Sequence, residues 1–451
     1  MFQRVLVANR GEIAVRVIRA LHELGIEAVA VYSTADADSL HVRLADRAVR
    51  LGPAPAAQSY LNIPSVVAAA TTTGCEAVHP GYGFLAENPA FVAACEDNGL
   101  VFVGPPADVM ARMGDKVQAK AEVARAEVPV VPGSQGAVAP DQARSLAAEL
   151  GYPVLLKASA GGGGKGMRIV EGDDELEAAL QTAAAEAEAA FGDPTLYLEK
   201  LVRPARHVEI QVLCDAKGVL TLGERECSIQ RRHQKLIEES PSPALTPEMR
   251  EAMEAAAARA AATIGYRNAG TFEFLVGPDQ SFYFIELNAR LQVEHPVSEL
   301  VTGIDLVREQ LRIAAGADLP LRGRAPRRGH AIEVRINAED PAEDFTPAPG
   351  TITTFRPPLG PGVRVDTFVE DGAEVPPFYD SLIAKLIVHA ADRRSAIARA
   401  ERALGELVVA GLPTTREAAI AILRSEEFAS GRYSTSFLEG SGRRLVEVAT
   451  E

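Results

Sequence analysis

Three features that would indicate a membrane or secreted protein are missing from this sequence. No apolar run reaches the ~18 residues that a membrane-spanning helix needs. Residues 1–10 contain neither the long apolar stretch nor the small-residue cleavage site of a signal peptide. The four cysteines are scattered, with no CxxC pair and no zinc-type spacing, so nothing suggests a disulfide framework. We therefore expect a cytoplasmic protein with reduced thiols and no membrane contact.

Basic residues are also fewer than acidic residues in this sequence. The chain has 46 Lys and Arg residues against 61 Asp and Glu residues, which gives a net charge of −15 at pH 7. A general nucleic-acid binder needs a surplus of Lys and Arg, so that class of protein is excluded, whereas a local basic pocket for a small anion is not. The chain is 47% hydrophobic, which indicates a globular protein with a substantial core, and 451 residues favour about three domains.

Short apolar runs alternate with stretches of helical spacing in the first hundred residues. The runs lie at residues 5–8, 28–31, 77–79 and 101–103. This β-α-β alternation predicts a parallel sheet covered by helices, in which ligands lie beyond the carboxyl ends of the strands. The Gly-rich segment 79–88 follows one such strand, although a simple tight turn explains it equally well. Gly11, which follows the first apolar run, is not part of a GxGxxG pattern, so no dinucleotide site is indicated after that run.

Four consecutive glycines, residues 161–164, form the second Gly-rich segment. They follow the apolar run 153–156 and lie between Lys157 and Lys165. Glycines leave backbone N–H groups free to turn towards phosphate oxygens, and the two lysines add positive charge. The pattern is not a GxxxxGK[ST] P-loop. A flexible linker is the alternative, but we favour a phosphate-binding loop of another type.

Polar residues gather in two further segments. Residues 206–212 predict a strand with His207, Glu209 and Gln211 on one face, although a solvated outer face would explain them equally well. Residues 230–235 concentrate three cations and a histidine, a composition that suits oxygen-rich anions.

The strictest alternation lies in residues 284–294. If that segment is extended, its polar side chains share one side, namely those of Glu286, Asn288, Arg290, Gln292 and Glu294. Such alternation predicts one half-buried strand or its extension. Asparagine is a poor strand former, which makes an ordinary solvent-facing strand a weak explanation.

Residue types within this segment indicate a chemistry. Glu286 and Asn288, with Glu273 from the preceding strand-like run, are hard oxygen ligands of the type that holds Mg²⁺ with substrate phosphates. Arg290 can donate two parallel hydrogen bonds to a carboxylate or carbonate. Glu294 is a carboxylate beside a cation and hence a candidate general base.

The rest of the sequence predicts two long helices, and a linker that precedes a strand. Residues 174–191 and 247–264 are Ala- and Glu-rich and predict helices. Residues 322–329 are rich in Gly, Pro and Arg and predict a linker before a strand at 330–337.

Taken in order, six motifs closely resemble those of the biotin carboxylases within the ATP-grasp superfamily. They lie at residues 8–14, 79–84, 161–166, 231–235, 292–296 and 335–340. The resemblance covers nearly the whole chain and implies an α/β protein, α+β overall. Its parts would be an N-terminal Rossmann-like parallel-sheet domain (1–112), an ATP-grasp domain (113–326, with a mobile lid at about 131–203) and a C-terminal mixed α+β domain (327–446).

The resemblance also implies residue roles. The ATP contacts would be Lys116, Lys157, Gly163, Gly164, His207, Gln230 and His233, with Glu199, Lys200, Leu201 and Val202 as the adenine-binding hinge. The ligands of Mg²⁺ or Mn²⁺ would be Glu273, Glu286 and Asn288. The bicarbonate contacts would be Lys235, Arg290, Gln292 and Val293. Glu294 would deprotonate bicarbonate, Arg335 would hold the ureido oxygen of biotin, and Tyr82 would lie near the biotin ring.

The implied reaction has two stages. Bicarbonate, deprotonated by Glu294, attacks the γ-phosphorus of ATP to give carboxyphosphate and ADP. Carboxyphosphate releases CO₂ and phosphate, the phosphate removes the proton from biotin N1, and the enolate captures CO₂. Closure of the lid would keep water from the unstable intermediate.

Departures from the family pattern bear on partners. Ala289 stands where relatives often have Thr or Pro, and Pro361 stands where some dimeric members have an aromatic contact, so a homodimer is not assumed. The chain contains no Met-Lys-Met carrier motif, so we expect biotin on a separate carrier protein, with a separate carboxyltransferase. The expected context is an acetyl-CoA or other acyl-CoA carboxylase in fatty acid biosynthesis.

Several alternatives stay open. The chain could instead serve a propionyl-CoA or pyruvate carboxylase. Another ATP-grasp ligase, such as a carbamoyl-phosphate-synthetase-like half, would share the ATP and metal residues but not segment 292–296 together with Arg335. A non-catalytic nucleotide-binding subunit would usually have lost the acidic metal ligands or the base, which are all present here.

Overall fold

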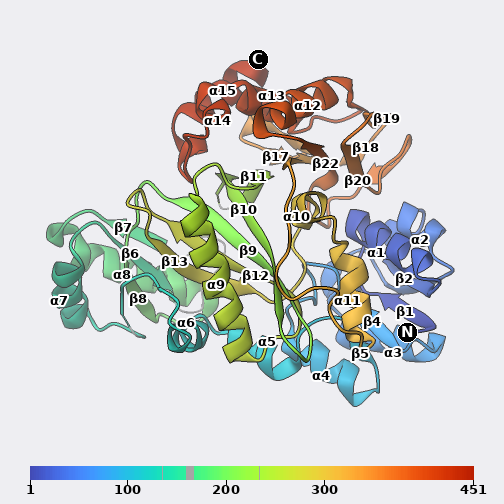
Figure 1. The fold of residues 1–451 in the computed structure, drawn as a ribbon, viewed down its shortest axis with the longest axis horizontal. Coiled ribbons are helices and arrows are strands. Elements are labelled where there is room, and N and C mark those ends of the chain that lie inside the picture. Colours follow the sequence, from blue (N-terminus) through green and yellow to red (C-terminus); the bar gives the residue numbers. More distant parts are fainter. Residues whose placement is uncertain (135, 159–166, 233, 451) are drawn as a thin grey trace.

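Three lobes surround one large central sheet (Figure 1). The computed structural model describes residues 1–134, 136–158, 167–232 and 234–450. The N-terminal lobe lies at the right of Figure 1, the lid lobe at the left and the C-terminal lobe at the top.

A five-stranded parallel sheet forms the N-terminal lobe, as predicted. Its strands are β1 (Arg4–Val7), β2 (Glu27–Ser33), β3 (Arg47–Gly52), β4 (Ala77–His79) and β5 (Val101–Phe102), in the order β3-β2-β1-β4-β5. Its helices are α1 (Gly11–Glu23), α2 (Leu40–Leu44), α3 (Ile63–Thr73), α4 (Pro89–Asp97) and α5 (Ala107–Gly114). The α1 helix buries Ile13, Val17 and Leu21 and is followed by Gly25, whose φ of +71° lies in the left-handed region that favours glycine.

The order of these strands reverses at β1, which places a ligand-binding switch point at the carboxyl ends of β1 and β4. The Gly-rich turn 79–88 begins there. Asn9, just after β1, donates from Nδ2 to the carbonyl oxygens of Pro80 and Tyr82, both at 2.7 Å. These two bonds fix the turn after β4 against the end of β1.

The lid lobe is a small antiparallel sheet with two helices. Its strands are β6 (Val154–Ala158), β7 (Met167–Val170) and β8 (Leu196–Lys200), in the order β7-β6-β8, and its helices are α7 (Pro140–Leu150) and α8 (Asp173–Phe191). Leu156, Leu180 and Leu198 belong to a hydrophobic core that this lobe does not share with the other lobes. The α6 helix (Lys116–Arg125) lies between the lid and the N-terminal lobe in the chain.

The central sheet has nine strands. Its strands are β9 (Arg206–Cys214), β10 (Val219–Arg231), β11 (Gln234–Ser240), β12 (Asn268–Val276), β13 (Phe282–Asn288), β14 (Gly323–Arg324), β15 (His330–Asn337), β20 (Val363–Thr367) and β22 (Leu382–Ala390). The order is β13-β12-β9-β10-β11-β15-β22-β20, with β14 beside β10. Because β11 pairs with β15, the sheet is continuous across residue 326, where the sequence predicts a domain boundary.

The two faces of this sheet differ in polarity. One face packs its apolar side chains against α9 (Pro247–Ile264), α12 (Arg393–Glu406) and α13 (Arg416–Arg424). The other face carries buried polar side chains and contacts α10 (His295–Thr302). Glu209 and Gln211 lie on that face and are fully buried, so the alternative of a solvated outer face for residues 206–212 is wrong. Buried charges require partners, and the partners define the site described below.

Segment 322–329 is anchored and does not form a free linker. Arg322 pairs with Asp215 at 2.8 Å, and Arg327 pairs with Glu224 at 2.5 Å. The arginines that suggested a linker therefore attach the segment to Glu224 of β10 and to Asp215, directly after β9.

The remaining elements are short or C-terminal. They are α11 (Leu306–Ala314), β16 (Glu339–Asp340), β17 (Thr346–Pro347), β18 (Gly350–Thr351), β19 (Thr354–Arg356), β21 (Glu374–Val375), β23 (Val408–Ala410), α14 (Glu426–Ala429), α15 (Ser441–Thr450) and four single 3₁₀ turns. All four cysteines are buried and free of disulfides. Within the described part of the chain, no helix has both the length and the apolar character needed to cross a bilayer.

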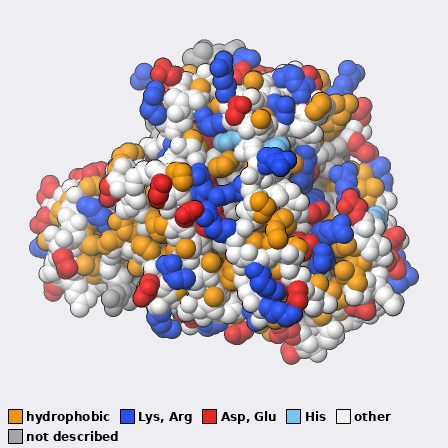
Figure 2. Space-filling view, in the orientation of Figure 1, with side chains coloured by type: hydrophobic (Ala, Val, Ile, Leu, Met, Phe, Trp, Pro, Cys, Tyr) orange, Lys and Arg blue, Asp and Glu red, His pale blue; other side chains and the backbone are white. Residues whose placement is uncertain are grey.

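Charge is distributed unevenly on the face drawn in Figure 2. Acidic and basic side chains are interspersed around its edge, and several Lys and Arg side chains gather near its middle, in the region of β10 and β11. A local basic region thus coexists with a net charge of −15.

Candidate active site

The predicted single extended segment 284–294 is only half extended. The β13 strand ends at Asn288, and Glu294 instead occupies the N-cap position of α10, without a capping hydrogen bond from its side chain. The backbone N–H of Ala289 donates to Glu87 at 3.0 Å, and Arg290 Nε donates to the same carboxylate at 2.8 Å. Glu87 belongs to the Gly-rich turn of the N-terminal lobe, so a contact between distant parts of the chain draws this segment out of the sheet.

The three predicted metal ligands lie together on neighbouring strands. Glu273 of β12 pairs directly with Glu286 of β13. Burial, and then the Glu273 carboxylate, raise the pKa of Glu286, and a divalent cation would relieve that repulsion. These hard oxygen donors fit Mg²⁺. Asn288 donates from Nδ2 to Glu273 at 2.9 Å, so its amide would have to rotate to offer an oxygen to a metal.

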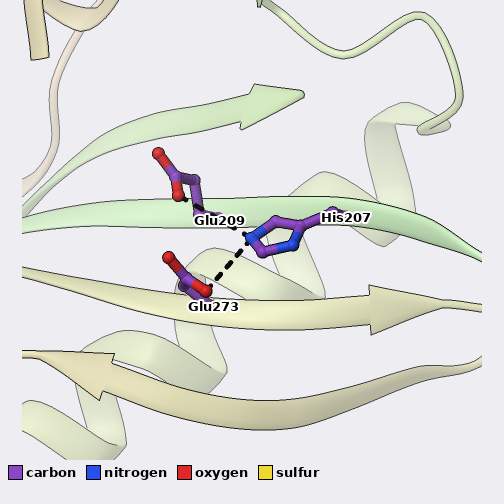
Figure 3. A group of neighbouring side chains, drawn as sticks. All are labelled: His207, Glu209 and Glu273. Atoms are coloured by element: carbon purple, nitrogen blue, oxygen red, sulfur yellow. Dashed lines mark ion pairs between the residues drawn. The ribbon is translucent and has the colours of Figure 1, made fainter. Parts of the chain in front are cut away.

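A second group of potential ligands lies next to this pair (Figure 3). His207 and Glu209 project from β9 and Glu273 from β12, and His207 Nε2 lies 3.2 Å from Glu273 Oε2. Their donor atoms lie within 4.8 Å of one another. The Lys235 ammonium contacts both carboxylates of this group, Glu209 at 2.7 Å and Glu273 at 3.1 Å, whereas the cation beside Glu286 is Lys116 at 3.7 Å. We therefore favour the Glu273–Glu286 pair as the metal site.

Lys235 is the cation at the centre of the site. Its ammonium donates to four acceptors, namely Glu209 Oε2 at 2.7 Å, Glu273 Oε1 at 3.1 Å, Gln292 Oε1 at 3.1 Å and Glu294 Oε1 at 2.5 Å. Burial opposes its charge, but the surrounding carboxylates raise the pKa of Lys235 well above its usual value. Lys235 is therefore a permanent cation, which suits the binding of a small anion.

Glu294 lies between two cations. Its Oε1 accepts from Lys235 at 2.5 Å and its Oε2 from Arg335 at 2.9 Å. Burial alone would raise the pKa of Glu294, but Lys235, Arg335 and Arg225 hold that pKa well below its usual range. The side chain is therefore ionised and can accept a proton.

Arg335 and Arg290 each have an acidic partner outside the predicted set. Arg335 Nε donates to Glu238 Oε1 at 2.6 Å, and both side chains are largely buried. Besides its bond to Glu87, Arg290 donates from Nη2 to Asn288 Oδ1 at 3.0 Å. Both guanidinium groups are thus oriented before any substrate binds.

The predicted ATP contacts converge from α6 and the lid. Lys116 Nζ lies 3.7 Å from Glu286 Oε2, and Lys157 Nζ donates to Glu199 at 2.5 Å. Lys120, a residue that sequence reasoning did not select, contacts the same Glu199 carboxylate. The Lys200 ammonium points to the carbonyl of Gly151 at 2.6 Å and holds a turn of the lid.

Other predicted residues fall at the edges of the site or beyond it. Gln230 pairs with Lys235 across the β10–β11 hairpin, and Leu201 and Val202 follow β8. Tyr82 donates its hydroxyl to Glu12 of α1. Gly163, Gly164 and His233 lie outside the described residues.

Sequence reasoning gave no role to several residues that complete the site. They are Glu12, Glu87, Lys120, Arg225, Glu238 and Lys385. Three successive charges in β10, residues 224–226, are the clearest signal that was available. A strand with charges on both faces cannot place all of them in solvent when it lies inside a sheet, so ion pairing is required.

Glu333 leads to a test of the electrostatics of this face. Neither of its oxygens accepts a hydrogen bond from a described residue, and the side chain is fully buried. Burial, and the nearby Glu238 carboxylate, raise the pKa of Glu333 well above its usual value. The folded protein then retains a proton that the unfolded chain releases, so the wild-type stability falls as pH rises.

Glu333→Gln removes that titration. We expect the free energy of unfolding of the variant, relative to wild type, to increase as the pH rises above the ordinary pKa of a glutamate side chain. Thermal unfolding midpoints at intervals of pH above that value measure the difference. A constant difference would show that Glu333 is not protonated by its surroundings.

Comparison with known proteins decides the family. Residues 1–110 match the biotin carboxylase N-terminal domain, residues 333–440 the biotin carboxylase C-terminal domain, and residues 115–322 the ATP-binding domain of the carbamoyl-phosphate synthase L chain. A biotin carboxylase from Nostoc is 52% identical over 441 residues, which cover 97% of this chain and 99% of the relative. The chain belongs to the biotin carboxylase family.

Similar proteins include one named for another carboxylase and one with a solved structure. A pyruvate carboxylase subunit from Methanothermobacter thermautotrophicus is 53% identical over 442 residues, covering 97% of this chain and 90% of that protein. A biotin carboxylase–β,γ-ATP complex from Campylobacter jejuni has a TM-score of 0.94 at 48% identity, with 97% and 99% of the two chains covered.

A further solved structure is the biotin carboxylase domain dimer of the Hydrogenobacter thermophilus 2-oxoglutarate carboxylase, with MgADP, ADP and bicarbonate. Its TM-score is 0.93 at 47% identity, and 99% of each chain is covered. Together these matches confirm the predicted family, fold class and ligase activity with ATP.

Proposed function

We propose that this chain carboxylates biotin at the expense of ATP, with Glu294 as the base that deprotonates bicarbonate. The observation that supports this function best is the position of Glu294, whose two oxygens lie 2.5 Å from Lys235 and 2.9 Å from Arg335. One cation suits bicarbonate and the other suits biotin, so a single carboxylate adjoins both substrate sites.

ATP binds between the lid and the central sheet in this proposal. Lys116, Lys157 and His207 neutralise its phosphates, and residues 199–202 hold the adenine. Glu273 and Glu286, with Asn288, hold Mg²⁺ or Mn²⁺, which neutralises charge on the phosphate oxygens when bound. Positioning and charge neutralisation are the main contributions that a protein makes to phosphoryl transfer.

Bicarbonate binds beside the phosphates. Lys235, Arg290, Gln292 and Val293 hold the anion. As bicarbonate takes over part of the hydrogen bonding of Lys235, its own negative charge raises the proton affinity of Glu294. The base therefore becomes stronger when the substrate arrives. The deprotonated bicarbonate oxygen then attacks the γ-phosphorus of ATP, the bond from that phosphorus to ADP breaks, and carboxyphosphate and ADP are formed.

Biotin binds at the opposite side of Glu294. Carboxyphosphate breaks into CO₂ and phosphate, and the phosphate takes the proton from biotin N1. Arg335 donates to the ureido oxygen and stabilises the enolate that attacks CO₂. Tyr82 lies along the biotin ring. The anchoring of Arg335 by Glu238 at 2.6 Å supports its role as a preoriented donor.

Biotin reaches this site on a carrier protein, and a separate carboxyltransferase passes the carboxyl group to an acyl-CoA. Relatives named for pyruvate and 2-oxoglutarate carboxylation leave propionyl-CoA and pyruvate carboxylases as alternatives. The domain boundaries 1–112, 113–326 and 327–446 are part of the proposal, and the family matches 1–110, 115–322 and 333–440 support them.

Steady-state ATP cleavage tests the proposal. We expect ADP release that requires bicarbonate and divalent metal and that increases on addition of free biotin. Equal rates without bicarbonate would exclude the function, as would a failure of biotin to stimulate. Purification with native partners, followed by assays with acetyl-CoA, propionyl-CoA and pyruvate, identifies the acceptor.

A further inference from the structure

Lys385 is a buried cation that the proposed reaction does not use. It lies on β22, directly opposite Arg335 on β15 and Asp366 on β20, and its side chain is fully buried. Its ammonium donates to the carbonyl oxygen of Val293 at 2.8 Å and lies 3.1 Å from Glu12 Oε1. The C-terminal lobe thus contacts the segment that carries the base.

The carbonyl that Lys385 holds belongs to the peptide that links Val293 to Glu294. That planar group fixes the direction of the chain as it enters Glu294. The carbonyl of Gln292, the residue before Val293, is held independently by His295. Its backbone N–H donates to that oxygen at 3.3 Å, and its ring atom Nδ1 lies 2.8 Å from the same oxygen. With both carbonyls held, the side chains of Gln292 and Glu294 both point to Lys235.

Glu12 anchors Lys385 from the N-terminal lobe. This carboxylate projects from the first turn of α1 and is 3% exposed. It also accepts the hydroxyl of Tyr82, whose own carbonyl is fixed by Asn9. The chain of contacts from Asn9 through Tyr82, Glu12 and Lys385 therefore joins the switch point of the N-terminal sheet to the base.

The charge on Lys385 is maintained by its surroundings. Burial opposes that charge, but nearby carboxylates, Glu12 first among them, raise the pKa of Lys385 above its usual value. A charged donor to a backbone carbonyl makes a stronger hydrogen bond than a neutral one. The Val293 peptide is thus held by a permanent cation whose counter-ion lies in another lobe.

We propose that Lys385, anchored by Glu12, is a positioning residue that fixes the Val293–Glu294 peptide and so aligns the base with bicarbonate. This inference rests on the proposed function. Misplacement of a reacting group by about 1 Å can reduce the rate about 10²-fold, so loss of this hydrogen bond is large enough to measure in the kinetics.

Two variants and their combination test the role in the full-length chain. Lys385→Met removes the donor, and Glu12→Gln removes its anchor and leaves the lysine in place. We expect kcat/KM for bicarbonate to fall about 10- to 100-fold in Lys385→Met and less in Glu12→Gln, with KM for ATP within about twofold of wild type. Because both residues act on one peptide, the double variant should be no worse than Lys385→Met alone.

A comparison variant separates positioning from general destabilisation. Arg393→Met breaks a partly buried ion pair of the C-terminal lobe, which Arg393 makes with Glu239 at 2.7 Å, without touching residues 292–295. It should lower the unfolding midpoint and leave kcat/KM for bicarbonate unchanged. If Lys385→Met does not fold, the kinetics of Glu12→Gln carry the test.

Two failures remain distinguishable. A wild-type protein without bicarbonate-dependent ATP cleavage would overturn the proposed function. An active wild type would overturn the positioning role alone if folded variants kept the wild-type kcat/KM for bicarbonate. Equal losses with bicarbonate and ATP, or additive losses in the double variant, would also overturn it.

Discussion

Replacement of Glu294 by glutamine is expected to reduce bicarbonate-dependent ATP cleavage by at least about 10²-fold, the contribution typical of a positioned general base. Glutamine has nearly the same shape but cannot accept the proton. It also turns an N–H₂ group towards one of the two cations, Lys235 or Arg335, that the carboxylate contacts at 2.5 Å and 2.9 Å. The chemical step and bicarbonate binding should therefore both weaken.

ATP binding should survive this change, because the side-chain partners of Glu294 are Lys235 and Arg335, and none of the described residues assigned to the nucleotide is among them. A nucleotide dissociation constant from calorimetry, together with the rate of ADP release, separates binding from turnover. Glu238→Gln is the matched comparison. It makes the same carboxylate-to-amide change next to Arg335, at 2.6 Å, in a residue that accepts no substrate proton in the proposal. A Glu294→Gln enzyme that turned over at a rate near wild type would refute the role of the base.

The elements near the site were predictable wherever local pattern decides structure. Residues 206–212 and 284–288 alternate strictly, and both lie in strands, β9 and β13. The end of β13 was not predictable in this way. It depends on Glu87, about two hundred residues earlier in the chain, which takes the N–H of Ala289 and draws the segment away from the sheet.

The division of the polar segment between metal and bicarbonate had a different origin. Alternation indicated a shared polar face, and only the family resemblance assigned roles to Glu286 and Glu294. The structure places Glu286 opposite Glu273 on the sheet and Glu294 at a helix start beside Lys235. The two residues are therefore separated by a change of backbone conformation, which a period-2 pattern cannot reveal.

Buried charges were the least predictable part. A charged residue in a strand is usually solvated, so Arg225 and Glu238 taken singly indicated no function, and only the run of three charges at 224–226 indicated ion pairing. Their burial follows from the width of the central sheet, since β10 and β11 are interior strands covered by α10. The sheet forms only from residues far apart in sequence, and local patterns contain no record of that pairing.

Arg225→Met is expected to lower the free energy of unfolding by about 3–5 kcal/mol, the usual cost of removing one partner of a buried ion pair. The Arg225 side chain is fully buried. It bonds Glu209 and donates to Gln211 Oε1 at 2.7 Å, to Ser298 Oγ at 3.0 Å and to Thr271 Oγ1 at 3.1 Å. These partners come from β9, α10 and β12, so one guanidinium joins the sheet to the helix that begins directly after Glu294.

Loss of Arg225 also changes the active site, because Glu209 then depends mainly on Lys235 at 2.7 Å, with His207 Nε2 more distant at 4.0 Å. A stronger Glu209–Lys235 pair withdraws Lys235 from Glu294 and from bicarbonate, so KM for bicarbonate should rise together with the loss of stability. Urea unfolding and bicarbonate kinetics measure the two effects. Lys217→Met is the control, since the exposed Lys217–Asp318 pair should contribute less than about 1 kcal/mol. A stability loss as small as that control would mean that Glu209 is neutral in the folded protein and that Arg225 does not balance its charge.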